Sequence, residues 1–239
     1  MTGFLIEHKL LPKSPVGIFM KMTNNIDNKE SALRIHDWRL AVRDILGPGI
    51  RAVVWVQGCS LHCDGCIAPE TWSKESGSLV DPHVLAETIL KNETIEGITV
   101  SGGEPTEQPY AVAELLACMK LAGKNTWVYS GHTLDELVAK NDPDLDRMLA
   151  FTDVLVDGRF DKMSAGIYTY RGSENQRILH LQDLGQMDDS DVKEQSRLEI
   201  TLDKDGQMVV VGVPPPEFLN KLKDALSRRG VQVDYKSGG

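Results

Sequence analysis

The chain has 239 residues, of which 41% are hydrophobic, so it is long enough for one substantial core and a small appendage. Its 35 acidic and 26 basic residues give a net charge of −9, and no block of Lys and Arg is long enough to follow a phosphate backbone, which argues against nucleic acid as a ligand. No apolar run approaches the roughly 20 residues that span a bilayer, so we expect no membrane partner and a cytoplasmic location.

The N-terminal part of the chain carries two different patterns. Residues 1–30 mix Pro, Asn, Lys and scattered apolar residues without a helix or strand period, which predicts a poorly ordered extension. We expect the main domain over residues 31–182. Within it, residues 51–57 are rich in β-formers and predict a buried strand that ends at Gly58 and a cluster of cysteines.

Helices and strands alternate after the cysteine cluster. The expected elements are a helix over 82–90, a strand over 97–100, a helix over 110–122, a strand over 126–129, a helix over 134–139 and a strand over 153–156. This alternation predicts an α/β fold of parallel β/α units, in which the carboxyl ends of the strands lie at one edge. Gly58, Gly102, Gly131 and Gly158 follow those ends, so we expect the chemistry there.

The C-terminal part has a different organisation. Residues 183–197 form an acidic stretch that reads as a linker, and residues 198–236 form a small α+β appendage. Its strands, 198–202 and 208–213, flank Asp205-Gly206, a strong hairpin signal. A helix over 215–229 and a strand over 231–235 complete the expected appendage.

Three of the four cysteines, Cys59, Cys63 and Cys66, lie within eight positions. Clustered thiols in a reducing compartment usually meet at a metal, and one loop can wrap all three around a single inorganic group. A [4Fe–4S] cluster ordinarily takes four thiolates, so three would leave one iron free for another ligand. The alternative is a structural zinc site completed by His62 or Cys118, although no second CxxC or HxxxH pattern is present. We expect Cys118 to pack in its helix as a small hydrophobe and neither His62 nor His132 to be a ligand.

A second motif, Ser101-Gly-Gly-Glu-Pro105, follows a predicted strand. Successive glycines allow positive φ, so backbone N–H groups can turn toward a ligand, while Glu104 and exposed carbonyl groups can receive an ammonium. The same sequence also fits a plain turn between a strand and a helix.

Together these motifs resemble the radical S-adenosylmethionine (SAM) activating enzymes, most closely the anaerobic (class III) ribonucleotide reductase activating protein family. The resemblance covers about residues 47–181. It is carried by Gly47-Pro-Gly-Ile-Arg51, the strand and cysteine loop through Thr71-Trp72, Ser101-Gly-Gly-Glu-Pro105, Trp127-Val-Tyr-Ser-Gly131, Val154-Leu-Val-Asp-Gly158 and Arg171-Gly-Ser-Glu-Asn-Gln176. The resemblance also implies that the α/β fold is a partial (β/α) barrel of the radical SAM type.

The resemblance implies an oxidoreductase in which Cys59, Cys63 and Cys66 hold a [4Fe–4S] cluster and SAM binds the free iron. The turn Gly102-Gly103-Glu104 would then hold the SAM amino group. Reduction would cleave SAM to a 5′-deoxyadenosyl radical that abstracts hydrogen from a glycine of a glycyl-radical enzyme, with flavodoxin or ferredoxin as electron donor.

Further residues are candidate contacts of SAM. Ser130 and Asp157 end strands at the expected active edge, where they can touch SAM, although Asp157-Gly158 equally fits a simple turn. Arg171, Ser173 and Asn175 can contact the SAM carboxylate or the partner, since an Arg fork suits carboxylates.

Two other functions remain open. One is a radical SAM enzyme that modifies a peptide or small molecule, with the appendage reading that substrate. The other is a non-catalytic iron–sulfur or zinc module.

Overall fold

A computed structural model describes residues 31–181, 185–186, 197–202 and 208–231. The expected extension over 1–30, nearly all of the expected linker and the strand over 231–235, apart from its first residue, lie outside these described residues. The domain boundaries therefore stay predictions.

An eight-stranded mixed sheet forms the centre of the fold, in the order β10-β9-β6-β5-β4-β2-β1-β3. Its strands are β1 Leu33–Arg43, β2 Ile50–Val56, β3 Ser78–Val80, β4 Gly97–Gly102, β5 Asn125–Tyr129, β6 Val154–Asp157, β9 Arg177–His180 and β10 Gly185–Gln186. Neighbours among β2, β4, β5 and β6 are parallel, and the outer pairs are antiparallel. The predicted α/β class is confirmed, and the open sheet corresponds to the predicted partial barrel.

Four helices connect the parallel strands: α2 Pro82–Leu90, α3 Pro109–Leu121, α4 Leu134–Ala139 and α5 Pro143–Ala150. Side-chain caps mark the starts of α2, α4 and α5, whereas α3 begins without one. The side chains of Asp81 and Asp142 accept backbone N–H groups before α2 and α5, and Thr133 forms a capping box with Glu136 at α4. The predicted helix over 82–90 has the same bounds, whereas the α5 segment was not predicted.

The sheet buries both of its faces. Ala52, Val54 and Val56 of β2 point toward the helices and join the largest apolar cluster. Val53 of the same strand points to the opposite face, where it packs with Val42, Ile45, Leu46 and Val211. Strands buried on both faces are nearly continuously apolar, which is why β2 could be recognised from its sequence.

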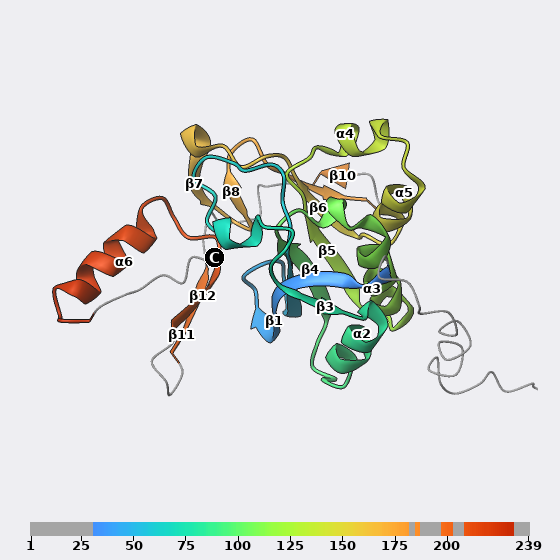
Figure 1. Cartoon of the computed structure of the whole chain (residues 1–239), viewed down its shortest axis with the longest axis horizontal. Helices are drawn as coiled ribbons and strands as arrows, with labels where there is room; N and C mark the ends of the chain where they lie inside the picture. Colours follow the sequence, from blue (N-terminus) through green and yellow to red (C-terminus); the bar gives the residue numbers. More distant parts are fainter. Residues whose placement is uncertain (1–30, 182–184, 187–196, 203–207, 232–239) are drawn as a thin grey trace, which may run out of the picture.

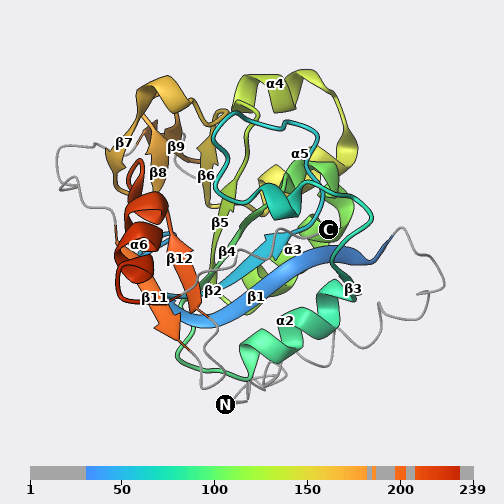
Figure 2. The same cartoon turned by 60° about the vertical axis from the view of Figure 1, so that its left-hand side comes forward.

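The C-terminal appendage lies on the face of the sheet away from α2, α3 and α5 (Figures 1 and 2). It consists of the antiparallel pair β11 Leu198–Leu202 and β12 Met208–Gly212, followed by α6 Phe218–Ser227. The predicted hairpin and helix are therefore confirmed. Val211 is 4% exposed and packs with Val42, Ile45, Leu46 and Val53, which we call the inner apolar cluster, on what we call the inner face of the sheet. The appendage therefore covers part of this face.

A smaller antiparallel pair, β7 Ala165–Tyr168 and β8 Arg171–Ser173, lies between β6 and β9 in the sequence. Figures 1 and 2 place this hairpin at the same end of the molecule as α4. That end carries the carboxyl ends of the parallel strands.

No helix among the described residues is both long enough and apolar enough to cross a membrane.

Candidate cluster and cofactor site

The cysteines lie in a loop that leaves the carboxyl end of β2 and crosses the end of the sheet near α4 and the β7–β8 hairpin (Figure 1). Its base is closed by two backbone hydrogen bonds, from Gly58 N to Thr71 O at 2.7 Å and from Cys59 N to Trp72 O at 3.1 Å. The buried amide of Gln57 also donates to the carbonyl groups of Glu70 and Ser73. The loop is therefore held at both ends, while the segment between them projects over the strand ends.

All three loop cysteines are free thiols, and they differ in exposure. Cys59 is buried at 9% exposed, whereas Cys63 and Cys66 are half-buried. Burial raises the pKa of the Cys59 thiol and, together with the neighbouring Cys66, that of Cys63. A metal must therefore displace protons from these groups, which is the usual coupling between thiolate ligation and pH.

The donor set of this loop suits a cluster. Among the described residues, no three His, Cys, Asp or Glu side chains are close enough together to hold a single metal ion. An iron–sulfur cluster takes each thiolate on a different iron, so its ligands need not converge on one point. Three sulfur donors on one loop fit that requirement.

Gly102 and Gly103 stand where the backbone of β4 passes against the start of the cysteine loop. Gly103 N donates to Val56 O, and Glu104 N donates to Gly58 O, both at 2.8 Å. A Cβ on Gly103 would overlap the carbonyl oxygen of Gly58, and a Cβ on Gly102 would lie 2.6 Å from Val56 N. The N–H groups of Gly103 and Glu104 donate to protein carbonyl groups, so they do not turn toward a ligand, which the sequence had suggested as one possibility.

The Glu104 carboxylate is also engaged by the protein. It is 1% exposed. One oxygen accepts hydrogen bonds from the Thr106 N–H and hydroxyl and from the Ser130 hydroxyl, and the other accepts from Gly131 N at 2.8 Å. This carboxylate joins the ends of β4 and β5, with Pro105 buried beside it in the first turn of η3, Pro105–Glu107. Ser101 is half-buried at the end of β4, opposite Trp55.

Ser130 and Asp157 end adjacent strands, as predicted, and both are buried. Ser130 accepts from His132 N in addition to its bond to Glu104. Asp157 binds the Arg177 guanidinium through both oxygens, at 2.9 and 2.5 Å, and accepts from Leu134 N at the start of α4. Arg177 was not singled out from the sequence because its partner lies across an antiparallel pair.

Arg171, Ser173 and Asn175 belong to the β7–β8 hairpin and the turn that follows it. Arg171 donates to the carbonyl groups of Glu174 and Gln176 and lies over the Tyr168 ring. Ser173 is fully buried and accepts from Asp161 N, while Asn175 donates to Arg159 O. The short 3-10 helix η4, Lys162–Ser164, which precedes β7, contacts the cysteine loop where Lys162 pairs with Asp64 at 3.3 Å.

Cys118 packs in the core as predicted, and the rings of His62 and His132 contact other side chains. Cys118 is 3% exposed within the helix-side core and lies 3.3 Å from His83 Nδ1, so it belongs to the α2–α3 interface and not to the loop. Burial raises the pKa of this thiol to about 12. The His62 ring packs on Trp72 with centroids 4.7 Å apart, and His132 Nδ1 lies 3.8 Å from Glu136.

Besides Arg177, a second residue of the site gave no signal in the sequence. Glu107, in η3, accepts hydrogen bonds from both the N–H and the hydroxyl of Ser60 and pairs with Lys74. Partial burial opposes ionisation of this carboxyl, but the bonds from Lys74 and Ser60 outweigh it and hold the pKa below its usual range. Its contact spans 47 positions, so no local pattern could have indicated it.

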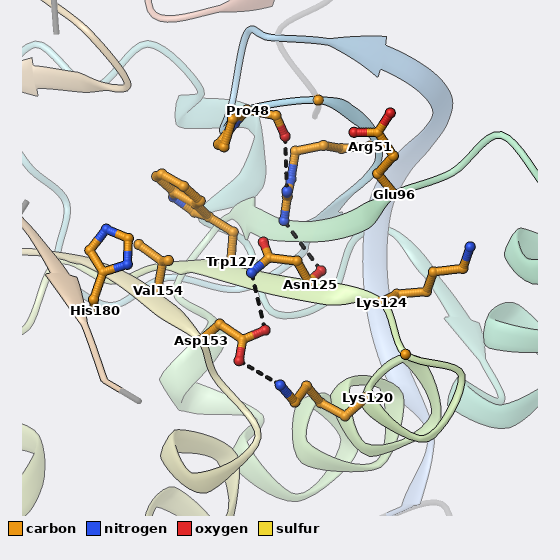
Figure 3. A pocket seen from close by; sticks show the side chains of 12 residues that line it. Pro48, Arg51, Glu96, Lys120, Lys124, Asn125, Trp127, Asp153, Val154 and His180 are labelled. Atoms are coloured by element: carbon orange, nitrogen blue, oxygen red, sulfur yellow. Dashed lines mark hydrogen bonds and ion pairs between the residues drawn. The ribbon is translucent and has the colours of Figure 1, made fainter. Parts of the chain in front are cut away.

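A separate hollow of about 620 Å³ lies at the opposite edge of the sheet, where β2, β5 and β6 begin (Figure 3). Arg51 is 2% exposed there and donates to Thr99 Oγ1 and to the carbonyl groups of Ile98 and Pro48. Burial lowers the pKa of its guanidinium to about 10. Lys120 and Asp153 pair across the rim. No cysteine lines this hollow, so it is distinct from the predicted site.

Comparison with known proteins agrees with the motifs. The family described as "4Fe-4S single cluster domain" matches residues 45–179. Proteins named anaerobic ribonucleoside-triphosphate reductase-activating protein are similar over more than half of this chain. The one from Haemophilus influenzae is 37% identical over 146 residues, covering 57% of this chain and 90% of that protein. The one from Escherichia coli K12 is 34% identical over 148 residues, with 56% and 91% covered. The one from Enterobacteria phage T4 is 30% identical over 138 residues, with 55% and 85% covered.

A solved structure titled "Crystal structure of QueE from Escherichia coli" aligns with a TM-score of 0.38 and 14% identity, over 45% of this chain and 58% of that one. A likeness this slight supports no inference.

A loop of three thiols at the carboxyl edge of a parallel sheet, matched over 135 residues by a single-cluster family, defines an iron–sulfur protein of the radical SAM type. Within that class, the chain belongs to the family of the anaerobic ribonucleoside-triphosphate reductase-activating proteins.

Proposed function

We propose that this protein is a radical SAM enzyme that activates an anaerobic ribonucleotide reductase by generating a glycyl radical on it. The observation that carries the proposal is the loop of three free thiols closed against the Gly102-Gly103 turn. Family membership supports it, because relatives that share most of their length with this chain carry that activity in their names.

In this proposal Cys59, Cys63 and Cys66 hold the [4Fe–4S] cluster, and SAM occupies the position that a fourth thiolate would take. The bound cluster and SAM supply reductive cleavage of SAM to methionine and a 5′-deoxyadenosyl radical, which abstracts a hydrogen atom from the partner's glycine. The chain's own contribution is to hold the thiolates, orient SAM and exclude water.

The protein's hydrogen bonds suggest how the turn would contribute to SAM binding. Because four donors already engage the Glu104 carboxylate, we assign the SAM amino group to the carbonyl oxygens of Ser101–Gly103. Ser130, Asp157 and Pro105 would then shape the pocket from behind, through Glu104 and Arg177. Arg171, Ser173 and Asn175 would border it from the hairpin that follows η4, whose Lys162 contacts the loop.

The electron donor in this proposal is a flavodoxin or ferredoxin, and the location is the cytoplasm, where thiols stay reduced. The partner would be the reductase subunit that carries the glycine.

A second candidate keeps the SAM chemistry and changes the substrate to a peptide or a small molecule. It is favoured by one observation, namely that the β11–β12 hairpin lies beyond the matched residues 45–179 and covers part of the inner face of the sheet. In this second candidate, the hairpin, which the family match does not include, would control access of the substrate to the site.

The proposal is tested with full-length protein that is reconstituted anaerobically with iron and sulfide, then supplied with SAM and dithionite. We expect 5′-deoxyadenosine, together with a glycyl-radical EPR signal when the reductase from the same organism is added. An intact cluster that releases no 5′-deoxyadenosine contradicts SAM cleavage. Cleavage without the glycyl signal favours the second candidate, and zinc without iron uptake favours a structural metal module.

A further inference from the structure

Glu107 connects η3 to the cysteine loop through one carboxylate oxygen. Both the N–H and the hydroxyl of Ser60 donate to Oε1 at 2.6 Å. The other oxygen, Oε2, lies 2.6 Å from Lys74 Nζ. Because Ser60 directly follows Cys59, this carboxylate restrains the chain next to the first cysteine.

The residue on the other side of Cys59 is restrained by the same short segment. Glu104 N donates to Gly58 O at 2.8 Å, and the adjacent Gly103 N donates to Val56 O. Cys59 itself donates to Trp72 O. The backbone N–H groups of Gly103 and Glu104 therefore hold the chain before Cys59, and the side chain of Glu107 holds the chain after it.

Cys63 and Cys66 have a different environment. Both are half-buried, and the Lys162–Asp64 pair between them joins side chains that are 61% and 84% exposed. Exposed ion pairs of this kind contribute little to holding a geometry. Lys74 and Ser60 are exposed as well, but the Glu107 side chain between them is 16% exposed and accepts two hydrogen bonds from Ser60. Of the three cysteines, Cys59 is therefore the one whose backbone is held by hydrogen bonds at the end of the sheet without a bound metal.

We propose that Glu107 is a positioning residue for the iron–sulfur cluster: it orients the Cys59 segment, so that this thiolate forms a fixed first ligand on which the more exposed Cys63 and Cys66 close. The inference rests on the proposed function, since it assigns a role within that same site. Glu107 acts through Ser60 and does not itself touch the cofactor.

Residues that orient metal ligands from outside the coordination shell commonly change metal affinity by about 10-fold to 100-fold when they are removed. Glu107→Ala loses both bonds to Ser60 and the contact with Lys74, so we expect loss of iron to a chelator to be about 10-fold faster. Glu107→Gln keeps one acceptor oxygen for Ser60 and loses the charge, so its rate should lie between those of Glu107→Ala and the wild type.

The test uses the full chain, reconstituted anaerobically, as wild type, Glu107→Ala, Glu107→Gln and the control Glu87→Gln, which changes an exposed carboxylate on α2. Three quantities are compared: the rate of iron loss to a chelator, the EPR line shape of the dithionite-reduced protein, and the Tm of the metal-free protein. We expect Glu107→Ala to lose iron faster with an altered line shape and a Tm within a few degrees of the wild type. Glu87→Gln should match the wild type in all three.

Two results overturn the inference. In the first, Glu107→Ala retains its iron and its line shape. In the second, the iron loss of both Glu107 variants follows only a fall in Tm, with the spectrum of the loaded fraction unchanged. A wild type that takes up no iron–sulfur cluster refutes the proposed function itself, and the inference with it, whereas equal clusters in every variant refute the positioning role alone.

Discussion

At the scale of single residues, two glycines are required for different reasons. Gly103 is needed because a side chain would not fit, and Gly123 because its backbone is left-handed. Gly103 needs the absence of a Cβ because the carbonyl group of Gly58 occupies that space, with its carbon at 2.9 Å. Gly123 has nothing within 4 Å of the same position, but its φ of 71° lies in the left-handed region. The first glycine serves the contact between β4 and the cysteine loop, and the second serves the end of α3.

The two alanine variants should therefore behave differently. Gly103→Ala pushes backbone against backbone, and we expect a loss of about 3 kcal/mol in the free energy of unfolding together with poor iron uptake. Gly123→Ala should lose about 1 kcal/mol, the usual cost of a left-handed non-glycine residue, and take up iron normally. Urea unfolding and iron determination measure both effects. Normal iron uptake by Gly103→Ala would show that the close approach is dispensable.

Cys118 predicts a dependence of stability on alkaline pH. Burial raises the pKa of this thiol from 9.0 to about 12, so between these values the unfolded chain releases a proton that the folded chain keeps. Stability therefore falls as the pH rises above 9, by up to about 1.4 kcal/mol per pH unit from this group. Cys118→Ala should reduce that slope in urea unfolding at pH 8 to 10.5. Parallel curves for variant and wild type would contradict the assignment.

At the scale of elements, the alternation of helices and strands was predictable because β2, β4, β5 and β6 are buried on both faces and because Asp81 and Thr133 cap α2 and α4. β1 was missed. Its register shifts between Ile35 and Asp37 and again between Arg39 and Val42, so the two-residue period of a half-buried strand is broken.

In the site, too, local features could be predicted from the sequence and contacts between distant residues could not. The spacing of the cysteines is local and was found, and so was the turn at Gly102-Gly103. The bonds from Ser130 and Gly131 to Glu104 and those from Ser60 to Glu107 join residues 26 to 47 positions apart, whereas the bonds from Thr106 to Glu104 are local. A sequence names the groups in a turn, but only the folded chain shows which of them other protein groups already bind.

The attachment of the appendage can be tested on one strand. Val211 is 4% exposed and faces the inner cluster with Ile45, Leu46 and Val53, whereas Val210 pairs with Ile200 on the other face of the hairpin. Val211→Asp buries an unpaired charge and should detach the hairpin, while Val210→Asp should leave it docked. Limited proteolysis within 198–212 measures the difference. Equal cleavage of the two variants would indicate that this apolar contact does not hold the appendage.

At the scale of the whole molecule, the cysteine loop and the sheet are expected to have separate stabilities. The sheet is held by apolar clusters on both faces, and none of these clusters includes a loop cysteine. The loop is held at its base by Gly58, Cys59 and Gln57 and at Ser60 by Glu107, and further along, the exposed pair of Asp64 and Lys162 links it to the rest of the protein. A bound cluster would therefore order the loop directly. It would stabilise the sheet only indirectly, because the cluster binds the folded chain and not the unfolded one.

Removing the metal should accordingly open one segment. After chelation we expect amide hydrogen exchange to become at least 10-fold faster over residues 60–68, where backbone groups would lose the order that thiolate ligation imposes. The amides of β4, β5 and α3 should keep their protection, because the contacts between those elements do not pass through the loop. Cys118→Ala, loaded and stripped in parallel, controls for chelator effects on the remaining thiol. Faster exchange throughout β2 and β4 after chelation would instead show that the cluster helps to hold the sheet together. The hydrogen bonds from Gly103 and Glu104 and those to Glu107 would then form as a result of cluster binding, and would not orient the Cys59 segment before the cluster binds.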